Sequence, residues 1–522
     1  MASGDPLADR VILWTHAQIP NSDKDVELAW EVANDPGFSR VVKTGTVKAT
    51  AATGFTAKAD ATGLVAGNTY YFRFRSGAAL SSVGCTRTLP APGASEVALA
   101  VFSCSNYPAG FFSAYAEAAK TNAQFAVHLG DYIYEYAADG YASADAAALG
   151  RVSAPTHECL TLDDYRQRYA QYRSDPDSKV LHAAMPLIAV WDDHEIANDA
   201  WLGGAENHTE GAEGSFVARR AAAVQAWAEW MPVRLPDAAN PLKIYRSFDF
   251  GGLLALHMLD TRIIGRDKQI SFNELMNPAT AQQATATLAS TTRSILGQEQ
   301  LQWLQGQLAA SNATWQVLGQ QVLMGRMEFP VSVLMALNPS DTSPAAQAAG
   351  QKAISDYLTA KAVAAQNPAA LTQAQQDLLD TTKNPKLGYN LDAWDGYPVE
   401  REIVLASAAQ LRKKLVVLSG DTHNAWAAKL TLRNGVQVGQ EFAATSVSAP
   451  GFEEYLTSIP PGQLAAIFKG VVDDLQYCET ARRGFLLMQF SATKAEGTYY
   501  LLDTVKSKTY SVDSQNRHVY GA

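Results

Sequence analysis

The stretch FAVHLGDYIYEY, residues 125–136, begins as an apolar run and ends among acidic and phenolic side chains. Hydrophobicity that is continuous rather than alternating indicates a strand that is buried on both faces. Helical segments such as 108–120 and 297–311 cover such strands, so the sequence predicts an α/β domain. Five further apolar runs are closed by polar residues in the same way: VALAVFSCSN (97–106), LIAVWDDHEIAND (187–199), LLALHMLDTR (253–262), WQVLGQQVLMG (315–325) and LVVLSGDTHNAW (415–426).

The polar residues that close these runs are candidates for one shared site. In sheets of this kind a ligand binds outside the carboxyl ends of the strands. We therefore expect these residues around a single rim, although they are far apart in the sequence. They are Cys104, Asp131, Asp192, Asp193, His194, Asp421 and His423.

A different pattern occupies residues 1–90, where short alternating strands are separated by turn residues at intervals of roughly 8 to 12 positions. This spacing predicts an all-β sandwich. The run GLVAGNTYYFRFR has a turn glycine, Gly67, before a tyrosine that enters the next strand, as in the tyrosine corner of immunoglobulin-like domains. The segment LPAPGAS (89–95) is typical of a linker. We expect a second domain over 96–522, with a helical insertion near 344–382.

Composition excludes several classes of protein. The chain has 522 residues, of which 47% are hydrophobic and 18% are charged, as in a folded globular protein. Its formal net charge of −10 argues against nucleic-acid binding through a basic surface. It has no apolar stretch of the roughly 18 to 20 residues that a membrane helix needs. Four cysteines are too few for a disulfide scaffold but permit one bridge.

Three acidic motifs follow the apolar runs. In GDYIY, Asp131 could bridge two metal ions through its two oxygens while Tyr134 binds one of them as phenolate; the alternative is a solvated turn at a strand end. In WDDHE (191–195), adjacent acids repel one another unless a cation or several donors compensate them. The alternative is a set of surface acids that cap the next helix. Asn198 and Asp199 add further oxygen donors.

The motif SGDTHNAW (419–426) repeats the design, with Asp421 followed two positions later by His423. Cys104 in FSCSN ends another apolar run, and a buried cysteine is often only a small hydrophobic residue. A lone histidine is likewise more often a satisfied core residue than a ligand. Three such clusters at three strand ends, however, favour a metal site over coincidence.

The ordered motifs SGDPLADRVILWT, FSCSN, HLGDYIYEY, DDYRQRYAQYRSDPD, WDDHEIAND, LGQEQLQWL, WDGYPVER and SGDTHNAW resemble those of the PhoD-type alkaline phosphatases. This family is a branch of the metallophosphatases and is related to the purple acid phosphatases. The resemblance covers nearly the whole chain. It implies an immunoglobulin- or fibronectin-like sandwich followed by an αββα core of two facing sheets flanked by helices. It also implies Fe(III), calcium and hydrolysis of phosphomonoesters and phosphodiesters outside the cytoplasm.

Carried over by motif, the resemblance gives two sets of ligands. Cys104, Asp131, Tyr134 and His423 would hold the ferric ion. Asp131 would bridge to a calcium ion that is also held by Asp421 and Asn198. The related purple enzymes have GNHE where this chain has DDHE. Whether Asn198 or Asp193, which takes the asparagine position of that motif, is the calcium ligand therefore stays open.

The donor types agree with these metals, because phenolate, thiolate and one imidazole suit trivalent iron, and carboxylate and amide oxygens suit calcium. For the reaction, Asp131 would serve both ions. His194 is a candidate to contact the phosphate or to protonate the leaving alkoxide. Arg262 in LDTRIIGR could clamp a phosphate, or could be an ordinary surface arginine.

Two other functions stay open. A phosphodiesterase of the phospholipase D type would use the same scaffold and metals with a different pocket. A non-catalytic secreted protein could instead bind calcium at the rim for structural reasons. The expected partners are small phosphate esters.

The chain begins MASGDPLADRVILW, without the pattern of a signal peptide, so the protein is either cytoplasmic or lacks a removed leader. The resemblance implies a periplasmic or secreted protein exported with a twin-arginine leader. In an oxidising compartment we expect a disulfide between Cys159 and Cys478.

Overall fold

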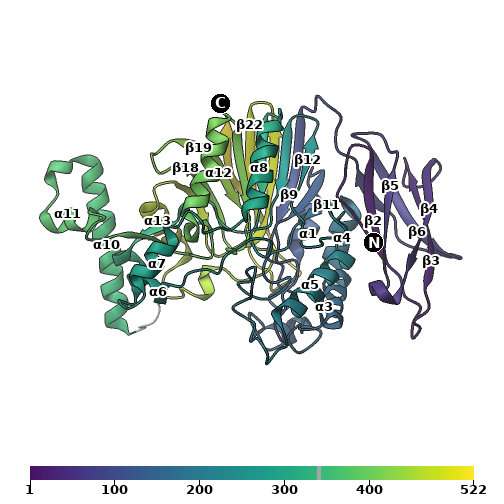
Figure 1. Cartoon of the computed structure of the whole chain (residues 1–522), viewed down its shortest axis with the longest axis horizontal. Coiled ribbons are helices and arrows are strands. Elements are labelled where there is room, and N and C mark those ends of the chain that lie inside the picture. Colours follow the sequence, from purple (N-terminus) through teal and green to yellow (C-terminus); the bar gives the residue numbers. More distant parts are fainter. Residues whose placement is uncertain (338–342, 522) are drawn as a thin grey trace.

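Two β-sheets lie face to face at the centre of the molecule, with helices on their outer faces (Figure 1). The structure is a computed structural model, and it describes residues 1–337 and 343–521. One sheet has nine strands, in the order β23 (Val512–Gly521), β22 (Lys494–Leu502), β21 (Arg483–Ser491), β9 (Glu96–Phe102), β10 (Phe125–His128), β11 (Leu187–Ala189), β1 (Ala2–Gly4), β2 (Arg10–His16) and β5 (Thr56–Thr62). The other has seven: β12 (Arg246–Phe250), β13 (Leu254–Met258), β14 (Trp315–Gly319), β17 (Lys414–Ser419), β19 (Gln437–Ala443), β18 (Ala425–Thr431) and β20 (Leu475–Glu479).

Helices complete four layers. On the side of the nine-stranded sheet lie α1 (Ser113–Ala118), α3 (Leu162–Ser174), α4 (Pro176–Ala184) and α5 (Phe216–Trp230). On the side of the seven-stranded sheet lie α8 (Gln298–Ala310), α12 (Pro398–Gln410) and α13 (Pro461–Val471). The predicted αββα fold is confirmed.

Strand β17 explains why the central strands are continuously apolar. Its Val416 and Leu418 pack into the core between the two sheets, whereas Leu415 and Val417 pack against the helices of the outer layer. Because successive side chains of a strand point to opposite faces, a strand in this position has no face left for polar residues.

The amino-terminal part is a β-sandwich that shares its sheet with the core. Strands β3 (Val26–Ala33), β4 (Val41–Ala49), β6 (Thr69–Ser76), β7 (Ala79–Leu80) and β8 (Gly84–Arg87) form a separate sheet. This sheet packs on β2 and β5 through buried side chains such as Val11, Leu13 and Phe72. The hydroxyl of Tyr70 accepts a hydrogen bond from the Val65 amide over 2.9 Å, which forms the tyrosine corner.

The short strand β1 connects the sandwich to the core. It pairs with β2 on one side and, in parallel, with β11 of the core on the other, with Gly4 opposite Leu187. A Cβ at position 4 would lie 2.5 Å from the Leu187 carbonyl oxygen and 2.3 Å from that of Pro232, so only glycine allows this approach. Hydrogen bonding is therefore continuous across the expected domain boundary.

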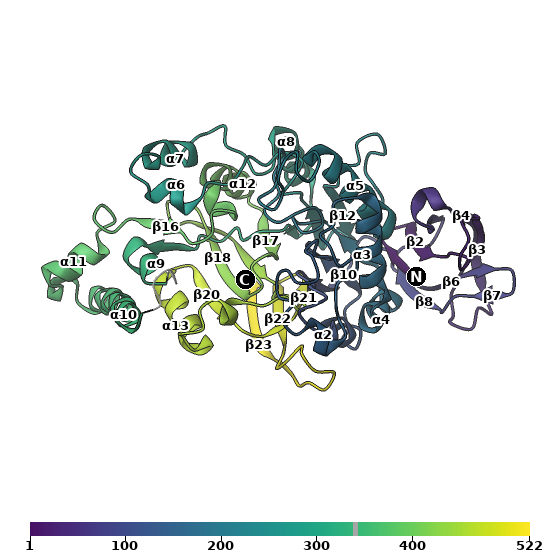
Figure 2. The same cartoon turned by 90° about the horizontal axis from the view of Figure 1, so that it is seen from below.

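The Ala- and Gln-rich segment forms α10 (Pro344–Gln366) and α11 (Gln373–Leu379). These helices project from the end of the molecule opposite the sandwich (Figures 1 and 2). Helix α10 packs on α9 (Val331–Leu337), and Lys361 donates a 2.8 Å hydrogen bond to the Gly470 carbonyl at the end of α13. No helix in the described ranges is long and apolar enough to cross a membrane.

The expected disulfide between Cys159 and Cys478 is wrong. All four cysteines are free thiols. Cys159 belongs to the hydrophobic core between the sheets and the helices around α3, whereas Cys478 packs in the separate cluster around α12 and α13. The two side chains lie in different layers, which the sequence spacing could not reveal.

We predict that the ion pair between Asp5 and Arg246 holds the shared sheet in place. Asp5 is buried, and its carboxylate accepts hydrogen bonds of 2.9 and 2.7 Å from the Arg246 guanidinium. Asp5→Ala removes the carboxylate and leaves that guanidinium bound only to the carbonyl oxygens of Ile244 and Ala189, so it should lower the free energy of unfolding by about 3 to 5 kcal/mol. Asp9→Ala, which removes an exposed pair with Arg10, should cost less than about 1 kcal/mol. Urea unfolding followed by circular dichroism measures both, and equal losses would contradict the prediction.

Candidate metal centre

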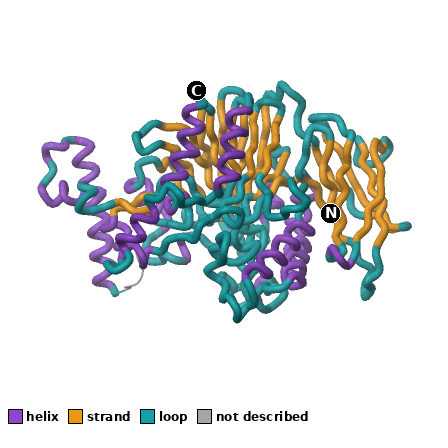
Figure 3. The backbone as a smooth tube through the Cα atoms, in the orientation of Figure 1, coloured by secondary structure: helices purple, strands orange, loops and turns teal. Residues whose placement is uncertain are grey.

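The candidate residues follow the carboxyl ends of parallel strands. Cys104 follows β9, Asp131 and Tyr134 follow β10, the acids of WDDHE follow β11, and Asp421 and His423 follow β17. The loops after these strands gather at one edge of the two sheets (Figure 3). The predicted rim is therefore present, and it lies where the two sheets meet.

Several of these residues have left-handed backbone conformations. The φ angles are 60° at Cys104, 55° at Asp131, 63° at Asp421 and 61° at His423. This region is rare for residues other than glycine and costs on the order of 1 kcal/mol or more each. Strain of this kind, present at four residues that follow three strands, is typical of a functional site.

One group of donors contains Cys104, Asp131 and His423, whose nearest ligand atoms lie within 4.8 Å of one another. The hydroxyl of Tyr134 donates to Asp131 Oδ2 over 3.0 Å and lies 3.0 Å from His423 Nε2. The structure thus brings together the four residues that the motifs assign to one ion. Cys104, Asp131 and Tyr134 are each at most 1% exposed.

A second group adjoins the first. Asp192, Asp193 and Asp421 present carboxylate oxygens within 4.8 Å of one another, and Asp131, Asp193 and His194 form a further set by the same measure. Asp131 and Asp193 each belong to two of these sets, so the carboxylates form a continuous cluster. Asp131 is therefore shared between the set that contains Cys104 and His423 and the set that contains Asp193 and His194.

Three buried carboxylate oxygens of this cluster lack a hydrogen-bond partner, although one of them, Asp193 Oδ1, lies 3.6 Å from the Arg262 guanidinium. Oδ1 of Asp131, Oδ2 of Asp192 and Oδ1 of Asp193 accept no hydrogen bond from any described residue. A buried, unpaired carboxylate oxygen is costly, and native proteins satisfy nearly all such atoms. The donor set and these orphaned oxygens fit bound cations.

The ionisation of the acids leads to the same conclusion. Burial, followed by the charge of neighbouring carboxylates, raises the pKa of Asp192 to about 7 and raises the pKa of Asp131 and Asp421 well above the ordinary range. Acids that are raised in this way do not all ionise together without added positive charge. Cations bound among them would supply that charge.

Arg262 supplies positive charge that offsets part of the negative charge of these acids. It is fully buried, and its guanidinium contacts Asp192, donates over 2.6 Å to Asp392 and donates over 2.8 Å to Asp421. The alternative of an ordinary surface arginine is wrong. Each of its three nitrogens already binds an aspartate, so Arg262 neutralises the acids of the cluster.

Asn198 forms hydrogen bonds to two glutamates. Its backbone N–H donates to Glu135 over 2.8 Å, and its side-chain amide nitrogen donates to Glu206 over 2.9 Å. Asp193, by contrast, is 2% exposed and shares its carboxylate with two of the donor sets. Of the two candidates, Asp193 is the one whose carboxylate lies in the acid cluster.

The family can be identified from known sequences and structures. A sequence model of the PhoD-like phosphatases matches residues 99–499, and a model of the PhoD-like phosphatase N-terminal domain matches residues 1–90. The chain belongs to the PhoD-like phosphatase family. It is a phosphatase, and the alternative of a non-catalytic calcium-binding protein is set aside.

Two relatives of this PhoD-like phosphatase agree with the assignment. Alkaline phosphatase D of Bacillus subtilis (strain 168) is 35% identical over 466 residues, which cover 86% of this chain and 69% of that protein. A solved structure titled Structure of PhoD is 30% identical and superposes with a TM-score of 0.78, covering 100% of this chain and 89% of that chain. The resemblance noted in the motifs is confirmed.

Sequence reasoning missed two buried glutamates of the phosphatase. Glu195 accepts hydrogen bonds from the backbone N–H groups of Asp131, over 2.9 Å, and of Asp192, over 2.7 Å, so it ties two strand ends together. Glu135 accepts a 2.8 Å hydrogen bond from Nδ1 of His194. Both glutamates stand in quoted motifs, and their place directly beside candidate ligands was the signal that could have identified them.

We predict that Gly130 is essential for the close approach of the two acidic turns. Its φ is 113°, and a Cβ there would lie 2.3 Å from Asp192 Cβ and 2.6 Å from the Asp192 backbone nitrogen. Gly130→Ala should push Asp131 and Asp192 apart and weaken metal binding at least about tenfold. Elemental analysis after equilibrium dialysis measures the loss.

Gly150→Ala is the matched control for that variant. Gly150 also has a left-handed backbone, with φ of 67°, but nothing lies within 4 Å of a Cβ built there. This variant should cost about 1 to 2 kcal/mol of stability and leave metal content unchanged. Full metal retention by Gly130→Ala would contradict the role given to this glycine.

Proposed function

We propose that this phosphatase is a metal-dependent hydrolase of phosphate monoesters and diesters that uses Fe(III) and Ca²⁺ outside the cytoplasm. The observation that carries the proposal is the meeting of Cys104, Tyr134 and His423 with buried carboxylates that lack partners. Thiolate, phenolate and imidazole suit trivalent iron, and a cluster of carboxylates suits calcium. The name of the Bacillus relative, alkaline phosphatase D, supports the reaction class.

The proposed ligands divide between the two groups of donors. Cys104, Tyr134 and His423 would hold iron, Asp193 and Asp421 would hold calcium, and Asp131 would serve both. Asn198 is kept as a further calcium ligand through its amide oxygen. When bound, two such ions supply positive charge to the phosphate oxygens and make water a better nucleophile near neutral pH.

His194 is the proposed proton donor. Burial by itself would lower the pKa of His194, but the carboxylates of Asp193, Glu135 and Asp131 outweigh burial and raise it well above the usual value. Glu135 accepts the Nδ1 proton over 2.8 Å, which directs Nε2 away from Glu135. The imidazolium can therefore give its Nε2 proton to the oxygen of the leaving alcohol.

Arg262 has a supporting role in this proposal. Its bonds to Asp192, Asp392 and Asp421 fix the carboxylates and reduce their mutual repulsion. A direct clamp on phosphate would require one of these bonds to break. We therefore assign Arg262 to positioning of the acids.

Export is a further part of the proposal. PhoD-type enzymes are expected to be exported through a twin-arginine leader, and a periplasmic or secreted location follows for this chain. Cell fractionation followed by immunoblotting of the natural gene product tests it. Retention in the cytoplasmic fraction would contradict it.

We predict that Asp131→Asn abolishes turnover more completely than Asp192→Asn. A bridging carboxylate serves both ions, so its loss should lower kcat/KM for p-nitrophenyl phosphate by about 10³-fold or more. Asp192 is bound to Arg262 and should affect the rate about 10- to 100-fold through positioning. Near-normal turnover by Asp131→Asn with both metals retained would exclude the bridge.

We predict that Tyr134 and Cys104 give the iron-loaded protein its colour. Ferric ion accepts charge from phenolate and thiolate, which produces a visible absorption band. Tyr134→Phe keeps the ring and its stacking on His194, at 4.2 Å between centroids, but removes the phenolic oxygen. The phenolate part of the band should disappear, and Cys104→Ser should alter the band separately. Iron-loaded protein with no visible band, or with a band that both variants leave unchanged, would contradict the assignment.

A further inference from the structure

An apolar hollow lies beside the proposed metal centre. It measures about 490 Å³, within the range of small-molecule sites, and lies between α6 (Phe272–Met276), α9, η4 (Phe452–Glu454) and α13. Its wall includes Phe272, Met276, Phe329, Leu334 and Phe468. Asn273, Tyr389 and Tyr455 are the polar residues among the described residues that line it, and none of the described lining residues is charged.

The hollow adjoins the proposed metal ligands through two tyrosines. The hydroxyl of Tyr455 donates over 3.0 Å to that of Tyr141, which in turn lies 3.2 Å from Nδ1 of His423. Tyr389 packs against Trp426 of the SGDTHNAW segment, with 6.2 Å between ring centroids, and this segment also carries Asp421 and His423. The apolar wall therefore begins next to the segment that carries two of the proposed metal ligands.

Tyr389 and Phe272 also line a polar cavity of about 810 Å³ that reaches Asp199 and Asp392. Asp392 binds Arg262, so this polar cavity borders the acid cluster. The polar cavity and the apolar hollow share Tyr389 and Phe272 as a common wall. These two rings therefore lie between the cavity that borders the acids and the apolar hollow.

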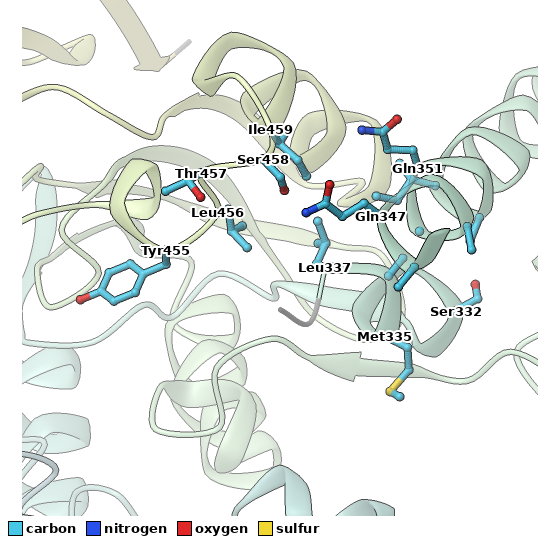
Figure 4. Close-up of a pocket in the computed structure, with 16 residues that line it drawn as sticks. Ser332, Met335, Leu337, Gln347, Gln351, Tyr455, Leu456, Thr457, Ser458 and Ile459 are labelled. Carbon is cyan, nitrogen blue, oxygen red and sulfur yellow. The ribbon is translucent and has the colours of Figure 1, made fainter. Parts of the chain in front are cut away.

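The hollow is open to solvent and continues along the surface. Met276 is 47% exposed and Met335 is 54% exposed, although both are large apolar side chains. Figure 4 shows the adjoining pocket between α9, α10 and the loop at Ser458, where apolar residues such as Leu337 and Leu456 lie with polar ones such as Gln347 and Ser458; its volume is about 430 Å³. Contiguous exposed apolar surface next to a catalytic site favours a ligand over a structural role.

We propose that this hollow binds an alkyl or acyl chain of the phosphate ester that the metal centre hydrolyses. The inference rests on the proposed hydrolysis of phosphate esters. A sugar or nucleoside would lose hydrogen bonds of its hydroxyl groups against a wall with so few polar atoms. Methionine side chains such as Met276 adapt to flexible chains. The substrate class is therefore a phosphate ester with one apolar chain.

The test is a series of alkyl p-nitrophenyl phosphodiesters whose alkyl chain grows from methyl to octyl. Water adds to phosphorus as the bond to the p-nitrophenyl oxygen breaks, and that oxygen leaves with a proton as p-nitrophenol. Each methylene that enters the hollow should raise kcat/KM about fourfold. A constant kcat/KM along the series would overturn the proposal.

Met276→Glu places a charge at the rim of the hollow and should abolish the dependence on chain length. The methyl ester should be hydrolysed within about twofold of the wild-type rate, because Met276 is exposed and lies outside the proposed metal ligands. Leu411→Glu is the matched control, since Leu411 is 40% exposed at the end of α12. An unchanged chain-length dependence in Met276→Glu, or its loss in Leu411→Glu, would overturn the proposal.

The same assay tests two proposals separately: that the hollow binds a chain, and that the protein hydrolyses phosphate esters. If the metal-loaded protein hydrolyses neither the methyl diester nor p-nitrophenyl phosphate, the proposed function itself is wrong. If it hydrolyses both at rates that do not depend on chain length, only the proposal that the hollow binds a chain is wrong. The octyl ester is assayed both below its aggregation limit and in lipid vesicles. This comparison shows whether the enzyme recognises a single chain or a membrane surface. Faster turnover only in vesicles would contradict a chain-binding hollow.

Discussion

Concentrated negative charge in a buried place is the constraint on which this phosphatase depends. Asp131, Asp192 and Asp193 are each at most 2% exposed, and Asp421 is drawn into the same cluster by Arg262. Arg262 and His194 offset part of this charge, and orphaned carboxylate oxygens remain. Removing ions from water is expensive unless opposite charge and hydrogen bonds compensate them. The strained turns, the glutamates and the arginine all serve to keep these acids close together.

The rest of the fold positions the strand ends that carry the acids. Two sheets packed face to face bring the end of β17 to the ends of β9, β10 and β11, so that residues remote in sequence can share an ion. Glu195 then joins the turn after β10 to the turn after β11 through backbone hydrogen bonds. The sandwich extends the same sheet through β1. The strand ends that carry Cys104, Asp131 and Asp192 thus belong to one nine-stranded sheet that continues into the sandwich.

Much of this could be predicted from the sequence, for a physical reason. A strand buried on both faces must be apolar throughout, so the polar residues that end it mark the open edge of the sheet, as at Asp131 and Asp421. The strand at Ala2–Gly4 was missed because three residues carry no periodicity. The burial of Arg262 and the partners of Glu135 and Glu195 were missed because they depend on distant segments. The expected disulfide was wrong for the same reason.

Anomalous scattering from crystals of protein purified without chelators tests the central claim most directly. Data collected on either side of the iron absorption edge should give an iron peak among Cys104 Sγ, Tyr134 Oη and His423 Nε2. A second ion without iron signal should lie between Asp193 and Asp421, with one Asp131 oxygen on each ion. Absence of iron from the first position, or ions that do not share Asp131, would contradict this account.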